Sequence, residues 1–190
     1  MRLILASASP RRLDLLDRIG VKPDGVDPAH INESVPDDEL PRAHALRLAI
    51  EKAEAVAARH SQALVLAADT VVAVGRRILP KVEDEATLRE CMTLLSGRRH
   101  RVLTGVAVAI PGEPTRSRVV ETMIAMKRLS PEEIDFYAGH GEWHGKAGGY
   151  ALQGYGEVYV RHIAGSYSNV VGLPLAETRL LLKSAGYAIA

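Results

Sequence analysis

The stretch Leu64-Val65-Leu66-Ala67-Ala68-Asp69-Thr70-Val71-Val72 decides how the fold is interpreted. The apolar residues 64–68 are typical of a buried strand, and the apolar residues from Val71 onward continue it. Asp69 lies between these two runs, where a carboxylate is costly to bury unless it is paired, hydrogen-bonded or bound to a metal. This position predicts a general base or a metal ligand that faces a cleft. The alternative is that Asp69 and Thr70 simply make a bend.

Helices and strands are expected to alternate on both sides of this stretch. The expected helices cover residues 10–19, 41–60 and 84–95, a segment that starts near 132, and a final segment after 174. Further strands are expected at 3–6, 101–110, 116–129 and about 157–163, and a long polar loop at 23–39. This order predicts a mixed α/β (α+β) fold without a clean doubly wound series.

The bulk composition limits the classes of protein that remain. A chain of 190 residues with 47% hydrophobic and 25% charged residues suits one globular domain or two closely joined lobes. A net charge of +1 argues against a general nucleic-acid binder. The one cysteine, Cys91, excludes an internal disulfide and cannot alone form a thiolate metal site. No apolar run approaches the ~20 residues that cross a bilayer, so we expect a cytoplasmic protein with no membrane partner.

A pair of arginines stands at an unusual place in the chain. Ser9 and Pro10 suit the start of a helix, and Arg11 and Arg12 follow in its first turn. Cations there oppose the helix dipole by roughly 0.3–1 kcal/mol each, unless an anion binds between the amides and the guanidinium groups. Ser7 can add a hydroxyl. A phosphate site and two solvated arginines remain equal alternatives from this motif alone.

Other motifs are weaker. Lys81 and Lys146 are able to neutralise phosphate oxygens, although a lone lysine is usually a solvated surface charge. The glycine-rich loop at 139–149 is not a P-loop, because only three residues separate Gly141 and Gly145 and no Ser or Thr follows the lysine. His140 and His144 lie among glycines, which argues against a helical metal motif.

Several motifs occur together in a fixed order, and their combination is more specific than any one of them. They are Leu5-Ala6-Ser7-Ala8-Ser9-Pro10-Arg11-Arg12, Arg47-Leu48-Ala49-Ile50-Glu51-Lys52-Ala53, Ala68-Asp69-Thr70-Val71-Val72, Leu95-Ser96-Gly97, Thr104-Gly105-Val106, Lys146-Ala147-Gly148-Gly149-Tyr150-Ala151-Leu152-Gln153-Gly154, Gly165-Ser166-Tyr167 and Val171-Gly172-Leu173-Pro174-Leu175. This set closely resembles the Maf family of nucleoside triphosphate pyrophosphatases, from Leu3 to about Thr178.

The resemblance implies a single domain, residues 1–190, with two lobes around an elongated mixed sheet, similar to inosine triphosphate pyrophosphatase. The nucleotide is expected in the cleft between the lobes. It also implies cleavage between the α and β phosphates, with a divalent metal cation, Mg²⁺ or Mn²⁺, as cofactor. A nucleoside triphosphate is then the expected small-molecule partner, and a homodimer is left open.

The resemblance also implies roles for individual residues. Asp69 matches the catalytic proton acceptor, and Glu33 matches an acidic position that shares a metal with Asp69. Ser7, Arg11, Arg12, Lys52 and Lys81 match the polar cleft that holds the phosphates, with Lys52 and Lys81 assigned to catalysis. Arg11, Thr70 and Gln153 match positions associated with base selection in the branch that prefers dTTP and UTP.

Two departures and two rivals accompany this interpretation. Asn32 stands where the family commonly has Asp, and Pro80 where Gly or a polar residue is common; both affect loop shape more than chemistry. One rival is a 7-methyl-GTP pyrophosphatase of the same family. The other is a non-enzymatic nucleotide-binding regulator of cell division, which would not need Asp69. The choice between normal and modified nucleotides is left open.

Overall fold

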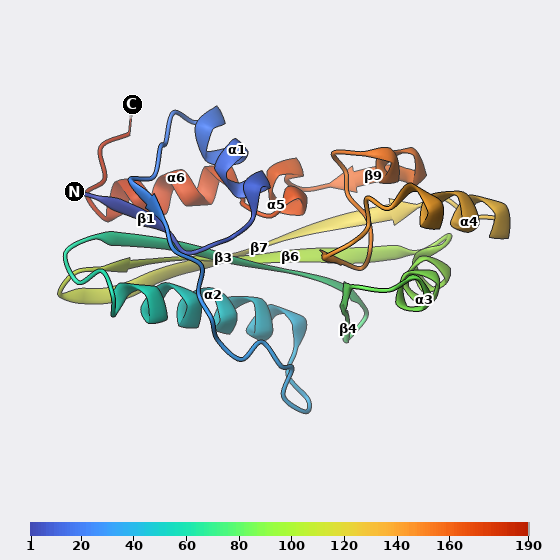
Figure 1. Ribbon diagram of the computed structural model, residues 1–190, viewed down its shortest axis with the longest axis horizontal. Helices are drawn as coiled ribbons and strands as arrows, with labels where there is room; N and C mark the ends of the chain where they lie inside the picture. Colours follow the sequence, from blue (N-terminus) through green and yellow to red (C-terminus); the bar gives the residue numbers. More distant parts are fainter. Residues whose placement is uncertain (190) are drawn as a thin grey trace.

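The computed structural model describes residues 1–189, and a long twisted sheet runs through it (Figure 1). Within these residues the strands are β1 (Leu3–Leu5), β2 (Gly25–Val26), β3 (Leu64–Val74), β4 (Arg77–Leu79), β5 (Lys81–Val82), β6 (Arg99–Ile110), β7 (Glu113–Met126), β8 (Lys146–Ala147) and β9 (Val160–Ala164). The helices are α1 (Pro10–Arg18), α2 (Pro41–Ala57), α3 (Glu85–Leu95), α4 (Pro131–His140), the 3₁₀ helix η1 (Tyr155–Tyr159), α5 (Tyr167–Val171) and α6 (Leu175–Ser184).

The main sheet is mixed, as the fold class predicts. Among residues 1–189 its strand order is β2-β1-β3-β6-β7-β9, with β4 paired to the far part of β3. β1 pairs in parallel with both β2 and β3, whereas the later pairs are antiparallel. β5 and β8 form a separate two-stranded sheet. The predicted mixed α/β fold is therefore confirmed.

Helices cover the two faces of the main sheet unequally (Figure 1). On one face α2 lies along β3 and β6. On the other face α5 and α6 lie over β6 and β7, and α1 lies beside α5. The face under α2 is lined by small side chains such as Ala67 and Ala107, which pack against Ala53 of the helix. The opposite face carries larger ones, for example Leu66 and Val108 near α1 and α6. Small residues let α2 approach the sheet closely, which matters for the site.

Most predicted elements are confirmed, and the Asp69-Thr70 bend is not observed. β3 is continuous through both residues, with Asp69 opposite Gly105 and Thr70 opposite Thr104 of β6. The helix expected to start near 132 is α4, which begins with a capping box formed by Ser130 and Glu133. Ser9 occupies the N-cap position of α1, but its side chain makes no capping hydrogen bond.

The expected strand at 157–163 is wrong in its first part. Residues 155–159 form η1, and β9 begins at Val160. The physical reason is a tertiary contact, because the N–H groups of Tyr155 and Gly156 donate to the Glu142 carboxylate at 2.9 and 2.7 Å. Sequence analysis also missed α5, whose Ser166 side chain accepts a hydrogen bond from the backbone of Asn169.

None of the helices that the structure describes, up to residue 189, has the length and apolar character needed to cross a bilayer.

Candidate active site

The site lies at a gap along one edge of β3. β1 pairs with Leu64–Leu66 on this edge, and β4 pairs with Val72–Val74 further along. Between these two pairings the edge of β3 borders a cavity of about 420 Å³. This volume lies within the range of small-molecule sites. The gap therefore opens the centre of the sheet to a ligand.

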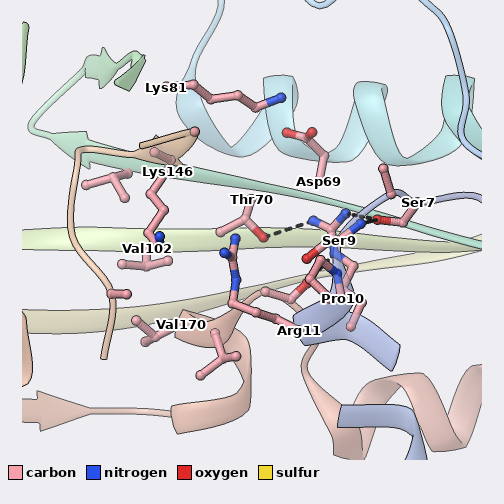
Figure 2. A pocket seen from close by; sticks show the side chains of 18 of the residues that line it. Ser7, Ser9, Pro10, Arg11, Asp69, Thr70, Lys81, Val102, Lys146 and Val170 are labelled. Atoms are coloured by element: carbon pink, nitrogen blue, oxygen red, sulfur yellow. Dashed lines mark hydrogen bonds between the residues drawn. The ribbon is translucent and has the colours of Figure 1, made fainter. Parts of the chain in front are cut away.

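Successive side chains of a strand point to opposite faces of the sheet. Neighbouring residues of β3 at the gap therefore line the cavity from both faces. Asp69 points toward α2, and Thr70 points to the opposite face (Figure 2). We call the α2 side, with Glu33, Lys52, Asp69 and Lys81, the charged side. We call the opposite side, with Val72, Val102, Tyr150, Leu152 and Val170, the apolar side. One cavity thus joins two chemically different walls around the edge of a single strand.

The charged side depends on the close packing of α2. A Cβ atom on Gly105 would stand 2.1 Å from the backbone oxygen of Ala45 in α2, so only glycine fits between the helix and β6. This approach buries Lys52 and Asp69, whose exposed fractions are 7% and 4%. Lys52 Nζ lies 2.6 Å from Asp69 Oδ1. A buried charge needs such a partner, and the register of α2 against β3 provides it.

Glu33 extends the same ion-pair cluster from the long loop. Its Oε1 lies 2.7 Å from Lys52 Nζ, and its Oε2 lies 2.5 Å from Lys81 Nζ. Burial acts to raise the pKa of Glu33, but the hydrogen bonds from Lys52 and Lys81 outweigh it and lower this pKa to about 2. Two lysines and two carboxylates therefore alternate along the charged side.

Arg12 connects the two sides. Its Nε donates to the backbone oxygen of Gly172 at 2.9 Å, Nη1 to Ser7 Oγ at 2.8 Å, and Nη2 to Thr70 Oγ1 at 3.4 Å. Burial lowers the pKa of Arg12, an effect that the Asp69 charge partly offsets. The guanidinium is thus held in place by neutral oxygen atoms rather than by a carboxylate, and its charge remains available to an anion.

Arg11 and Lys146 also reach the cavity (Figure 2). Burial lowers the pKa of both, and the positive charge of Arg11 lowers that of Lys146 further. The sequence gives only weak evidence that Lys146 binds phosphate, since a lone lysine near glycines is usually a solvated surface charge. The β5–β8 pair brings it to the site by placing Val82 opposite Lys146 and Lys81 opposite Ala147. Five cationic side chains and two carboxylates line the cavity, which makes it strongly cationic.

The apolar side is built from β3, β6, α5 and the loop after β8. Tyr150 is anchored there by a 2.6 Å hydrogen bond between its hydroxyl and Nε2 of His100. Burial lowers the pKa of His100 to about 4 and raises that of Tyr150, so the pair is neutral at pH 7. Gln153 lies on the rim of the cavity, next to the turn that Glu142 holds through Tyr155 and Gly156. A flat, mostly apolar ligand group with a polar edge suits this wall.

All of the sequence-predicted site residues line this one cavity: Ser7, Arg11, Arg12, Glu33, Lys52, Asp69, Thr70, Lys81 and Gln153. They come from six separate segments of the chain. The structure brings them together, while their individual roles remain predictions.

The carboxylates of the cavity provide oxygen atoms that could hold a metal ion. Among residues 1–189, no group of three or more His, Cys, Asp or Glu side chains is gathered to hold a metal ion. Glu33 and Asp69 contribute two carboxylates around Lys52. Mg²⁺ commonly uses one or two carboxylates together with substrate phosphates. The residues therefore fit a cation that phosphate oxygens help to hold.

The chain matches one protein family along nearly its whole length. The family model described as Maf-like protein matches residues 2–185. A protein of Paramagnetospirillum magneticum named dTTP/UTP pyrophosphatase is 60% identical over 186 residues, which cover 98% of each chain. One of Caulobacter vibrioides with the same name is 60% identical over 97% of this chain and 96% of its own. A solved dITP/XTP pyrophosphatase of Mycobacterium abscessus is 18% identical, with a TM-score of 0.45 over 74% of this chain and 94% of its own.

Proposed function

The chain belongs to the Maf family, and from this premise we propose that it hydrolyses nucleoside triphosphates to a nucleoside monophosphate and pyrophosphate. The observation that carries the proposal is the convergence of five cationic side chains on the buried Asp69 at the gap in β3. A triphosphate needs several cations, and its hydrolysis needs a group that accepts a proton from water. One cavity holds both.

Asp69 is the proton acceptor in this proposal. Lys52 contacts its Oδ1, and we assign the other oxygen, Oδ2, to the attacking water. The water oxygen forms a bond to the α phosphorus while the bond from that phosphorus to the bridging oxygen breaks, and the water proton passes to Asp69. Pyrophosphate leaves with the bridging oxygen. Such proton transfer typically contributes about 10²–10⁴-fold to the rate.

The cations stabilise the charge that moves onto the leaving pyrophosphate. Lys81 and Arg12 line the same cavity as Asp69, so both can reach a polyphosphate that passes over the edge of β3. Arg12 is restrained by three hydrogen bonds, and a restrained donor loses little freedom when an oxyanion forms. Lys52 keeps Asp69 and Glu33 in place.

A divalent cation, Mg²⁺ or Mn²⁺, is part of the proposal, with Glu33 and Asp69 as its protein ligands. When bound, it would neutralise phosphate oxygens and so lower the barrier to attack by water. Both carboxylates face the same cavity, which supports this assignment.

We further propose dTTP and UTP as the preferred substrates. Relatives 54–60% identical to this chain carry that substrate pair in their names. The apolar side offers room for a base beside Val102 and Val170, and Gln153 at its rim has both a donor and an acceptor for a pyrimidine edge. Such chemistry belongs in the cytoplasm, where nucleoside triphosphates are found, and it requires no nucleic-acid partner.

The test is a panel of purified triphosphates, followed by release of pyrophosphate and of orthophosphate. The proposal expects pyrophosphate with dTTP and UTP, and slower reaction with dATP, dGTP and 7-methyl-GTP. Orthophosphate as the main product would refute cleavage between the α and β phosphates. A purine or 7-methyl-GTP as the best substrate would refute only the pyrimidine preference.

A further inference from the structure

A line of hydroxyl groups runs from the buried core to the cavity. Thr104 Oγ1 donates to the backbone oxygen of Asn169 at 2.9 Å, and Thr70 Oγ1 lies 2.9 Å from Thr104 Oγ1. Arg12 Nη2 then donates to Thr70 Oγ1 at 3.4 Å. Thr104 is completely buried, whereas Thr70 lines the cavity.

The direction of the protons in this line follows from counting them. A hydroxyl group has one proton, and a carbonyl oxygen has none to donate. Thr104 uses its proton for the Asn169 oxygen, so the contact between the two threonines requires Thr70 to be the donor. If Thr104 donated its proton to Thr70 instead, Thr104 Oγ1 and the backbone oxygen of Asn169 would be two acceptors only 2.9 Å apart. Thr70 therefore has no proton left for a ligand. One of its two lone pairs accepts from Arg12 Nη2, and the other is left for a ligand in the cavity.

The buried end of the line is firmly held. Asn169 is fully buried, and its Nδ2 donates to Val102 O at 3.0 Å and to Thr122 Oγ1 at 2.9 Å. Thr122 is also fully buried, and its Oγ1 donates to Ser166 O and accepts from Ser166 N. The Asn169 backbone oxygen, which sets the direction of the line, is therefore fixed from two strands.

Thr70 lies on the wall where a base would lie. It shares its face of β3 with Val72, and its partner Thr104 shares a face of β6 with Val102. Val170 of α5 lies across from them (Figure 2). The remaining lone pair of Thr70 favours a ligand group that carries an N–H, because a second acceptor placed against it would leave both groups without a hydrogen bond.

We propose that Thr104, which nothing else assigns to the site, is a positioning residue for base selection: it keeps Thr70 an acceptor that reads the N3–H of a uracil or thymine base. Cytosine has an unprotonated N3, so two acceptors would face each other. This inference rests on the proposed pyrophosphatase function, and it gives a physical origin for a preference between pyrimidines of nearly equal size.

The test compares hydrolysis of UTP and CTP by the wild type, Thr104→Val and Thr104→Ser, with kcat and KM measured for each. Thr104→Val keeps the shape of the side chain but frees the Thr70 proton. Since a correctly paired hydrogen bond is worth about tenfold in discrimination, the ratio of kcat/KM for UTP to that for CTP should fall about tenfold. The change should come mainly from a lower KM for CTP. Thr104→Ser should restore the ratio.

Thr178→Val is the matched control. Thr178 is also fully buried, and its hydroxyl has no hydrogen-bond partner within residues 1–189, so this variant should keep the wild-type ratio. An unchanged ratio in Thr104→Val, in a variant that unfolds at the wild-type temperature, would overturn the inference. So would a ratio that Thr104→Ser fails to restore. Failure of the wild type to release pyrophosphate from UTP would instead refute the proposed function.

Discussion

The two sides of β3 surround neighbouring residues of one strand with different kinds of contact. On the charged side, Lys52 and Asp69 are buried and held by ion pairs 2.6 and 2.7 Å long that also include Glu33. On the apolar side, Thr70 lies near valine side chains, and its hydroxyl group is hydrogen-bonded to the Thr104 hydroxyl and to the Arg12 guanidinium. Asp69 and Thr70 are adjacent in the chain, and their side chains lie on opposite faces of the sheet.

From this difference we infer separate roles for the charged side and the apolar side. Charge–charge interactions are strong and depend little on orientation, so they suit the binding of phosphates. Hydrogen bonds between neutral groups are weaker but depend on which atom carries the proton, so they suit the choice between bases. Changes on the charged side should therefore affect turnover, and changes on the apolar side should affect the choice of substrate.

The largest expected effect tests the proposed metal on the charged side. Excess chelator should abolish pyrophosphate release from dTTP, and added Mg²⁺ or Mn²⁺ should restore it, because the two carboxylates and the phosphates need a cation between them. The measurement is pyrophosphate release during titration with chelator and then with metal. Full activity in excess chelator would show that the arginines and lysines suffice and that Glu33 and Asp69 do not bind a metal.

Next in size is Asp69→Asn, which leaves the shape of the charged side but removes its proton acceptor. The kcat for dTTP should fall by about a hundredfold or more, with little change in KM. Asp14→Asn, an exposed position on α1, is the control for loss of one carboxylate and should keep normal kinetics. Near-normal turnover of Asp69→Asn would remove this residue from the mechanism.

Gly105→Ala tests whether the charged side depends on the close approach of α2. The added Cβ meets backbone atoms of Ala45 that cannot rotate away, so the free energy of unfolding should fall by roughly 1–3 kcal/mol or more. Activity should fall too, because α2 carries Lys52. Denaturant unfolding measures the first effect and pyrophosphate release the second.

The control for that substitution is Gly139→Ala, since a Cβ at Gly139 in α4 meets nothing within 4 Å. This variant should be as stable as the wild type or slightly more so, because alanine favours a helix. Equal stability of the two variants would mean that α2 moves aside at no cost.

The smallest expected effect belongs to Gln153→Glu on the apolar side. This change removes a donor and keeps the shape, so the preference for dTTP and UTP over dATP and dGTP should weaken by about tenfold or less. Comparison of kcat/KM across the panel measures it. Gln62→Glu, which adds the same charge at an exposed position away from the cavity, should leave the preference unchanged.

Much of this molecule was accessible from the sequence alone. Apolar patterning located β1, β3, β6, β7 and the long helices within a few residues, since burial of one face leaves a periodic trace. The isolated acid in an apolar run singled out Asp69, because a buried carboxylate requires a partner. The cationic pair at the start of α1 suited an anion site and a pair of solvated arginines equally well, and the structure places both arginines at the cavity.

Only the tertiary structure decided how these residues meet. The sequence could not show that the edge of β3 is left open between β1 and β4, or that Asp69 and Thr70 therefore face opposite walls of one cavity. It could not show that Glu142 turns residues 155–159 into η1 rather than a strand, or that β5 and β8 bring Lys146 to the cavity. The direction of the Thr70 hydroxyl depends on Asn169, about a hundred residues away in the chain. The physical reason is the same each time. The pattern of apolar and polar residues indicates which residues are buried and which are exposed. Pairing between distant segments depends on contacts that form only in the folded chain.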